Sequence, residues 1–248
     1  MKKVIAANWK NNCSKEFINK YFSFFNANIN INKKSKKEII FFPPDLYLDL
    51  VSQSIKDLSG INYGCQNLNI NENNTTLTGG STSAMLEDMN CDYVIIGHSE
   101  TRENEFNKSL KSKILLCKKM NIIFCVGENS LERQNNETLK KIFSQLDELI
   151  ESYFDNMSII IAYEPVWAIG SGETPTLSNI SQTHESIKKY IIQKLPSIKE
   201  NDIIVLYGGS VTAKNANSIL KTDFVDGVLV GGASLMAEEF TKICNIEF

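Results

Sequence analysis

The stretch "SIIIAYEPVWAIGSGETP", residues 158–175, begins as a strand and continues as a loop. Its first part, 158–163, is an apolar, isoleucine-rich run that predicts a buried strand. Pro165 ends that strand, and the two glycines beyond it disfavour a helix. The loop still carries large apolar side chains at 166–169, which are typical of the underside of a flap that covers a site in one of its states. We therefore expect a lid, with Glu164 at the junction of strand and loop.

Seven other apolar runs have the same character as 158–163. They lie at 3–8, 38–42, 61–66, 93–97, 122–127, 203–208 and 227–232. The stretches between them have helical spacing, and no Pro-, Gly- or Ser-rich linker interrupts the order. This pattern predicts an α/β fold with one domain over 1–248, a closed (β/α)8 barrel of eight parallel strands inside an outer ring of helices. An open Rossmann-type sheet is the alternative, and it is disfavoured because no G-x-G-x-x-G follows the first run.

Two of the connecting stretches show helical spacing most clearly. After Ser14, apolar residues recur at 17, 18, 21, 22 and 25, as on the buried face of a helix capped by that serine. Leu139, Ile142, Phe143, Leu146, Leu149 and Ile150 also share one helical face. His184 lies in a further helical stretch, and we expect it on the surface.

Composition excludes several classes of function. The 248 residues are 42% hydrophobic and carry a formal net charge of −3. The chain therefore lacks the excess positive charge that is typical of nucleic-acid-binding proteins. The short basic stretch 32–37 is typical of a solvated turn. No apolar run approaches the length of a membrane span, and the first residues do not resemble a signal peptide. We expect a soluble cytoplasmic protein with neither a nucleic-acid nor a membrane partner.

The six cysteines indicate neither a metal site nor a disulfide framework. They form no C-x-x-C pair, and the chain has only two histidines. We therefore expect reduced thiols that are mostly packed, and no bound metal. Cys13 is the one cysteine that follows closely after a predicted strand end.

Polar and glycine residues follow the predicted strands directly. In a (β/α)8 barrel the carboxyl ends of all strands meet on one rim, where active sites lie. The segments in those positions are "NWKNN" at 8–12, "HSETR" at 98–102, "EPVWAIGSG" at 164–172, "GSVT" at 209–212 and "GGASL" at 231–235. An amide, an amine, an imidazole, a carboxylate and two glycine turns are thus expected at one rim.

Five segments carry a resemblance to a known family. "AANWK" (6–10), "VIIGHSE" (94–100), "AYEPVWAIGSG" (162–172), "LYGGSV" (206–211) and "DGVLVGGASL" (226–235) resemble those of the triosephosphate isomerases, in the same order and at similar spacing. The resemblance extends over effectively the whole chain. It implies a TIM barrel that interconverts dihydroxyacetone phosphate and glyceraldehyde 3-phosphate, as in glycolysis and gluconeogenesis, without a cofactor or metal.

The resemblance also implies the roles of three side chains in proton transfer. It makes Glu164 the base, whose carboxylate would lose water when the lid closes and so become a stronger base. It makes His98 the electrophile that hydrogen-bonds the substrate oxygens, in a neutral form favoured by a helix N-terminus. Lys10 would supply positive charge to the phosphate and to the enediolate.

The remaining residues that the resemblance implies bind the substrate or support the catalytic side chains and the lid. The resemblance places Asn8 at the substrate and makes Glu100 the ion-pair partner of Lys10. Substrate phosphate would be held by Gly170, Ser210, Gly231 and Gly232, since backbone amides in such turns can approach an anion closely. Tyr207 would belong to the loop that exchanges hydrogen bonds with the closing lid.

The chain departs from the family pattern in three places. The far end of the lid reads Ser171-Gly172-Glu173-Thr174-Pro175 instead of Thr-Gly-Lys-Thr-Ala, and Pro175 biases the residue before it toward extended backbone. Thr78-Gly79-Gly80 replaces Thr-Gly-Glu, and Glu100-Thr101-Arg102 replaces Glu-Arg-Arg. A glutamate and an arginine that pair between subunits in family dimers are thus both absent. We still expect a homodimer, with Thr78 near the partner's Lys10 region, because losing both leaves no buried charge unpaired.

Two other functions remain as alternatives. A different phosphate-binding barrel enzyme, such as an aldolase or a synthase, would need another catalytic side chain at a strand end. Glu128 is the spare candidate, and the resemblance makes it structural. A binding or adhesion protein would be free to lose Glu164, His98 or Lys10, and all three are present.

Overall fold

A computed structural model describes residues 2–30, 36–69, 78–102, 107–170 and 173–248. All eight predicted strands are present. Their bounds are β1 Lys3–Asn8, β2 Lys37–Phe42, β3 Ile61–Cys65, β4 Tyr93–Ile96, β5 Asn121–Val126, β6 Ile159–Tyr163, β7 Ile203–Tyr207 and β8 Gly227–Val230. The apolar runs therefore mark the strands to within about two residues, as expected for assignments at element ends.

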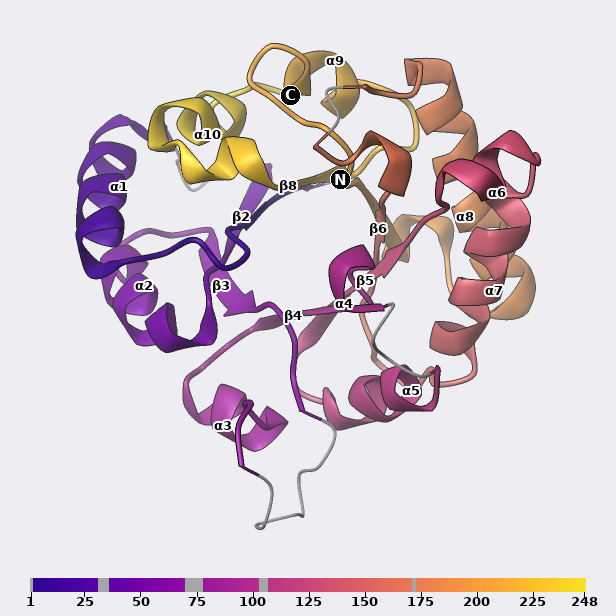
Figure 1. Cartoon of the computed structure of the whole chain (residues 1–248), viewed down its shortest axis with the longest axis horizontal. Helices are drawn as coiled ribbons and strands as arrows, with labels where there is room; N and C mark the ends of the chain where they lie inside the picture. Colours follow the sequence, from indigo (N-terminus) through magenta and orange to yellow (C-terminus); the bar gives the residue numbers. More distant parts are fainter. Residues whose placement is uncertain (1, 31–35, 70–77, 103–106, 171–172) are drawn as a thin grey trace.

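The strands close into a barrel (Figure 1). Each strand pairs in parallel with the next in sequence, and β8 returns to pair with β1 through Val4 opposite Gly227 and Ala7 opposite Val230. The predicted (β/α)8 barrel is confirmed. The Rossmann-type sheet is excluded because the strands follow in sequence order and the pairing of β8 with β1 leaves no edge among the eight described strands. The glycine at 227 is required at this closure, since a Cβ there would lie 2.0 Å from the carbonyl oxygen of Val4.

The strands are apolar on both faces because each face is buried against a different layer. Val4 and Ala6 belong to a cluster that fills the inside of the barrel. Ile5 and Ala7, which alternate with them, belong to a larger cluster between barrel and helices. This alternation is the two-residue period of a strand, and burial on both sides explains why the runs are continuous instead of alternating with polar residues.

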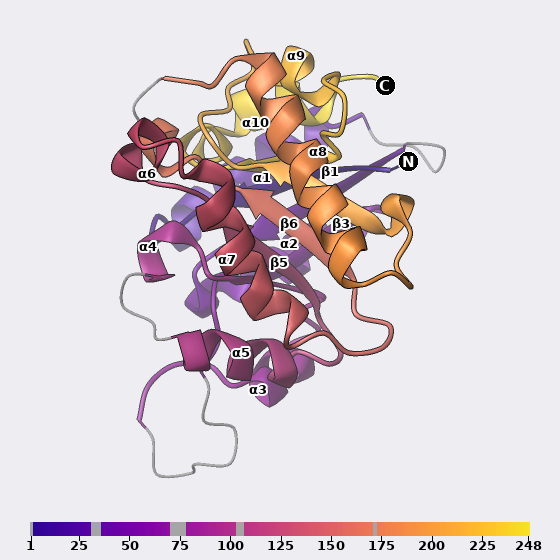
Figure 2. The same cartoon turned by 90° about the vertical axis from the view of Figure 1, so that its right-hand side faces the viewer.

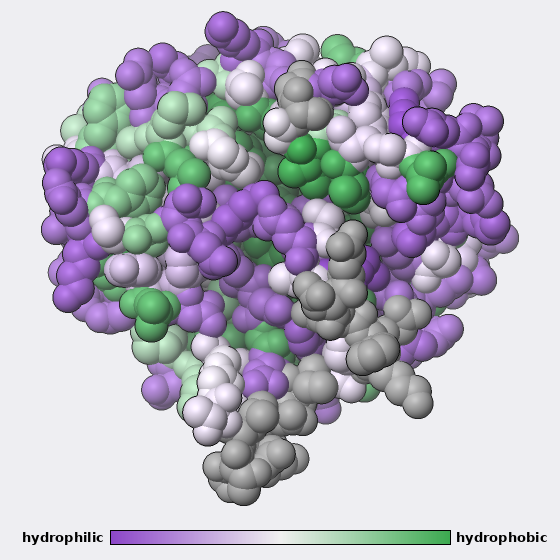
Figure 3. Space-filling view, in the orientation of Figure 1, coloured by the Kyte–Doolittle hydropathy of each residue, from purple (hydrophilic) through white to green (hydrophobic). Residues whose placement is uncertain are grey.

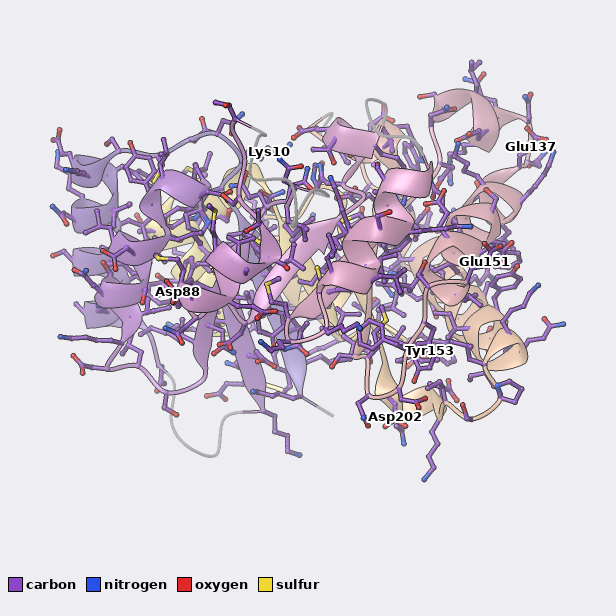
Figure 4. All side chains as sticks on the ribbon, turned by 90° about the horizontal axis from the view of Figure 1, so that it is seen from below. Lys10, Asp88, Glu137, Glu151, Tyr153 and Asp202 are labelled. Carbon is purple, nitrogen blue, oxygen red and sulfur yellow. The ribbon has the colours of Figure 1, made fainter. Side chains whose placement is uncertain are left out.

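Helices surround the barrel, as Figure 2 shows for α7 and α8 outside β5 and β6. The α-helices are α1 Lys15–Asn28, α2 Leu48–Ile55, α3 Ser83–Asp88, α4 Ser99–Arg102, α5 Asn107–Leu116, α6 Ser130–Gln134, α7 Thr138–Ile150, α8 Leu177–Lys194, α9 Ala216–Leu220 and α10 Ala237–Cys244. Short 3-10 helices are η1 Asp45–Tyr47, η2 Val166–Ala168, η3 Glu200–Asp202 and η4 Gly232–Leu235. Figure 4 places Lys10 and Glu137, at the start of α7, toward one end of the barrel and Asp202 toward the other.

The two helices predicted from spacing form as expected. Ser14 caps α1, with its hydroxyl accepting a hydrogen bond from the amide of Phe17 at 3.0 Å. The predicted face of α7 is buried at Ile142, Leu146 and Leu149. Leu139, at its first turn, is 39% exposed and so lies at the edge of that face. Apolar spacing therefore locates the buried face but not where burial ends along the helix.

The expected surface position of His184 is wrong. Its side chain is fully buried, with Nδ1 3.2 Å from the carbonyl oxygen of Phe224 and its ring edge-on to Tyr163. Phe224 has a φ of 63°, which is unusual for a residue other than glycine, so the histidine supports a strained turn between β7 and β8. The pKa of His184 is lowered to about 3, mainly by burial, and the positive charges of Lys188 and Lys3 contribute to that shift.

His184 should make the folded protein sensitive to acid. Its pKa lies below the value of 6.5 for an unperturbed histidine, so the unfolded chain binds the proton first and unfolding is favoured as pH falls below about 6.5. Between pH 7.5 and pH 5 this group alone should remove about 2 kcal/mol from the free energy of unfolding. In His184→Asn, which keeps a donor for Phe224, that loss should disappear. Urea unfolding of both proteins at one protein concentration measures the difference. An equal acid dependence in both would contradict the assignment.

Candidate active site

One cavity at the carboxyl ends of the strands collects the predicted binding and catalytic residues. It has a volume of about 490 Å³ and its lining includes Asn8, Lys10, His98, Glu164, Gly170, Ser210, Gly231 and Gly232. Figure 3 shows this face of the molecule, with hydrophilic side chains around its centre and hydrophobic ones over the segment after β6. Glu100 and Tyr207, predicted as supporting residues, lie outside the lining: Glu100 reaches Lys10, and Tyr207 is fully buried.

Glu164 follows the last residue of β6, and its carboxylate is held inside the rim. The residue is 2% exposed. Its Oε2 accepts a hydrogen bond from the amide of Ser99 at 3.0 Å, and its Oε1 lies 3.2 Å from Nε2 of His98. A nearly buried carboxylate needs such donors because burial otherwise disfavours its charge. The end of β6 and the start of α4 thus present a carboxylate and an imidazole in direct contact.

The hydrogen bonds of His98 assign its proton. The amide of Glu100 donates to Nδ1 at 3.2 Å, so Nδ1 is the acceptor and Nε2 carries the hydrogen. Nε2 points at Glu164 and lines the cavity with it. A neutral imidazole with a fixed N–H toward the cavity can donate to an oxygen that gains negative charge, whereas it would have to tautomerise to accept a proton there.

The backbone of Lys10 has a strained conformation. Its φ is 50°, in the left-handed region that costs an ordinary residue on the order of 1–3 kcal/mol. Two side chains hold that conformation: Asn8 Oδ1 accepts from the Lys10 amide at 3.0 Å, and Gln66 Nε2 donates to its carbonyl at 2.7 Å. The Lys10 ammonium pairs with Glu100, as predicted. Strain that is held by two side chains indicates that the position of this cation matters.

The turn after β8 offers backbone amides to the cavity. Gly232 opens η4, where the first N–H groups of a helix have no partner within it. Nothing lies within 4 Å of a Cβ placed on Gly232, so an incoming group can approach its backbone closely. Ser234 fixes the turn by donating from its hydroxyl to the carbonyl of Gly231 at 2.7 Å, and Trp9 Nε1 donates to the carbonyl of Ser234 at 3.1 Å. The turn is thereby tied to the strand end that carries Lys10.

The apolar segment after Glu164 is anchored by Glu128. This glutamate is fully buried, and its Oε1 accepts from Trp167 Nε1 at 2.9 Å. Its carbonyl accepts from the amide of Val166 at 3.0 Å, and Arg133 lies over the Trp167 ring at 4.3 Å. Burial raises the pKa of Glu128, and the donors of Trp167 and Tyr163 oppose that effect. Glu128 does not line the cavity at Lys10, so it anchors the segment at 166–168 and is not a second carboxylate of the site.

The segment at 207–210 also contacts the lid. Ser210 donates from its hydroxyl to the carbonyl of Ala168 at 2.6 Å, which is one of the contacts expected between these loops. The Tyr207 hydroxyl is buried and has no partner among the described residues. Gly170, at the far end of the described lid, has a φ of 70° and is exposed. Ser171 and Gly172, part of the predicted far hinge, lie outside the described residues.

Comparison with known proteins agrees with the site. The sequence model described as "Triosephosphate isomerase" matches residues 3–247. The chain is 38% identical to the triosephosphate isomerase of Buchnera aphidicola subsp. Schizaphis graminum, over 99% of this chain and 97% of that protein. It is 40% identical to that of Mesomycoplasma hyopneumoniae strain 7448, over 98% of both. The chain belongs to the triosephosphate isomerase family. It is therefore an isomerase. Within the described residues, no helix is long and apolar enough to cross a membrane.

Trp167 should stabilise this isomerase through its bond to Glu128. In Trp167→Phe the buried carboxylate loses its shortest side-chain donor, and the free energy of unfolding should fall by about 1–3 kcal/mol. Tyr163→Phe, which removes the longer bond of 3.2 Å to the same oxygen, should cost less. Urea unfolding of the three proteins at one concentration checks this order. Equal stability of Trp167→Phe and the unchanged chain would show that the bond contributes nothing.

Proposed function

We propose that the cavity at the end of the barrel interconverts dihydroxyacetone phosphate and glyceraldehyde 3-phosphate by proton transfer through an enediolate. The observation that carries the proposal is the contact between the Glu164 carboxylate and the Nε2–H of His98 beside Lys10. One group accepts a proton, the second donates to an oxygen, and the third supplies positive charge. Such a set suits removal of a proton next to a carbonyl.

In the proposed mechanism Glu164 takes a proton from carbon 1 of dihydroxyacetone phosphate. The C–H electron pair forms the carbon–carbon double bond, and the carbonyl pair moves onto oxygen, giving the enediolate. Nε2–H of His98 donates to that oxygen as its charge develops, and Lys10 stabilises the charge and the phosphate. The hydroxyl proton on carbon 1 then passes to the oxygen on carbon 2, and a carbonyl forms at carbon 1. The electron pair of the carbon–carbon double bond takes the proton back from Glu164 at carbon 2. A neutral histidine in this role, tuned by a helix N-terminus, is the arrangement known for this enzyme family.

The phosphate site and the lid complete the proposal. We assign the phosphate to the amides of Gly232 and its neighbours in η4 and to Gly170 and Ser210, with Asn8 at the substrate. To reach the substrate carbon, the Glu164 carboxylate must release the Ser99 amide. Closure of the segment at 166–170 then excludes water from an intermediate that otherwise eliminates phosphate. We propose that one domain, without cofactor or metal, contains the whole reaction.

Glu164→Asp tests the base directly. The shorter side chain withdraws the carboxylate by about 1 Å, which should lower kcat on the order of 10²-fold without unfolding the barrel. A coupled assay of glyceraldehyde 3-phosphate formation measures the loss, with Glu200→Asp at the opposite end of the barrel as the matched control. Full activity in Glu164→Asp would show that Glu164 is not the base. No activity in the folded, unchanged chain would favour a binding protein over an enzyme.

We further propose a homodimer in the cytosol. Leu46 in η1 is 91% exposed and Met85 in α3 is 60% exposed, and a partner that packs on both elements would cover these two apolar side chains together. The Ser81 hydroxyl donates to Asp45 at 2.7 Å and ties these two elements together. Leu46 also borders a hollow of about 470 Å³ that Lys10 lines. All six cysteines are free thiols, which supports a reducing compartment.

The proposed interface avoids an unpaired charge at the site of the missing arginine. Thr101, in that position, donates from its hydroxyl to the carbonyl of His98 at 3.1 Å. A short polar side chain therefore supports the catalytic loop from within its own subunit. Thr78 and Gly80, where the family's glutamate is absent, lie in an exposed segment before α3 that is available to the partner's Lys10 region.

Leu46→Glu should dissociate the proposed dimer. A buried charge without a partner costs several kcal/mol in an interface. Sedimentation velocity at micromolar concentration should show a dimer for the unchanged chain and a monomer for the variant. Leu131→Glu, on α6 and also 69% exposed, should stay dimeric. A monomeric unchanged chain would overturn the proposal.

A further inference from the structure

A second cavity lies behind the catalytic carboxylate. It has a volume of about 380 Å³, and its walls come from the ends of β4 and β5 and from α6 and α7. Glu164, Ser99 and Val166 line it on the side toward the active site. Because Glu164 also lines the substrate cavity, this residue forms the partition between the two spaces. Nothing in the proposed reaction uses the second cavity.

The wall formed by α7 contains two buried polar side chains, Gln145 and Glu148. Gln145 is 5% exposed, and its Oε1 accepts from the amide of Gly127 at 2.8 Å, so its Nε2 faces away from that bond. Across the described part of the chain, no atom accepts a hydrogen bond from this Nε2. Glu148, one helical turn later, is 7% exposed and uses Oε2 for Arg102, at 2.8 Å. Its Oε1 is left as an acceptor, and the spacing of three residues places it on the same face of α7 as Gln145.

The positive charges of this wall are already used. Arg102 donates to Glu148, to the carbonyl of Gly97 at 3.1 Å and to the carbonyl of Cys125 at 2.9 Å. Lys141 pairs with Glu132 at 2.9 Å. An anion such as the substrate phosphate would therefore meet carboxylates without a free cation, which disfavours it. A neutral molecule is favoured, with apolar contact from the valine and cysteine side chains of the lining.

We propose that this cavity binds a small planar molecule with a carboxamide edge and thereby inhibits the enzyme. The ligand's carbonyl accepts from Gln145 Nε2, and its N–H donates to Glu148 Oε1. Such a ligand lies against Glu164 and Val166 while the carboxylate is bonded to the Ser99 amide. It stabilises this position of the base and of the lid's first residue, so kcat falls with little change in KM. The inhibition rests on the proposed function, but the binding does not.

Benzamide and benzoate are a matched pair of probes for the site. They share shape, but benzoate lacks the N–H and carries a charge that Glu148 repels. Calorimetric titration of the unchanged full chain should give saturable benzamide binding with a dissociation constant on the order of 1 mM, as expected for so small a ligand. Benzoate should bind at least about tenfold more weakly. Saturating inorganic phosphate, which occupies the substrate cavity, should not displace benzamide, because the two cavities are separate spaces.

Two variants test the location of the site. Gln145→Glu keeps an acceptor for the Gly127 amide but replaces the donor, so benzamide affinity should fall about tenfold or more. If that variant does not fold, Ser144→Phe decides, because Ser144 is an exposed lining residue of α7 and a ring there blocks the cavity. Ser23→Phe, on the exposed face of α1 across the barrel, is the matched control and should bind benzamide normally.

The outcomes separate this inference from the proposed function. The proposed site is wrong if phosphate displaces benzamide or if benzoate binds as tightly as benzamide. It is also wrong if Ser144→Phe still binds benzamide. Benzamide binding with the expected variant pattern but unchanged turnover overturns the inhibition and leaves the site. Because calorimetry needs no reaction, a chain without isomerase activity that still binds benzamide in this pattern refutes the proposed function alone.

Discussion

The position of the Glu164 carboxylate is the constraint on which the rest of the structure depends. A buried carboxylate is costly unless donors satisfy it, and the donors here come from the residues that follow β4, Ser99 and His98. Those two residues reach it only because the barrel brings the ends of β4 and β6 to one rim, with β5 between them. The fold thus brings together a carboxylate and an imidazole that are 66 residues apart in sequence.

The groups around this carboxylate are fixed by side chains that do not themselves react. Gln66 and Asn8 hold the strained backbone of Lys10, and Trp9 ties the turn after β8 to the same strand end. Glu128 holds Trp167 and with it the lid. The cation and the turn after β8 are therefore fixed from the same strand end, whereas the segment at 166–168 is held separately. Pre-organisation of this kind keeps reacting groups within the fraction of an ångström that catalysis requires.

Much of this arrangement follows from the sequence, for physical reasons that also mark its limits. Apolar runs located all eight strands, because a strand buried on both faces has no other composition. The burial of His184 was missed, although its spacing from Ile180, Ile187 and Ile191 places it on the buried face of α8. Gln66 follows β3 and would have been found by examining every strand end. The donor from Ser99 is a backbone amide. The direction of a backbone amide cannot be predicted from the residue type, so the sequence did not indicate this hydrogen bond.

The central claim is that the reaction proceeds by removal and return of a proton at Glu164. The most direct measurement is proton magnetic resonance of the glyceraldehyde 3-phosphate formed from dihydroxyacetone phosphate in heavy water. A carboxylate that carries the proton between the two carbons exchanges it with solvent during part of the turnovers, so deuterium should appear at carbon 2 of the product. Product that retains all its protium at carbon 2 would indicate direct hydride transfer and would contradict the account.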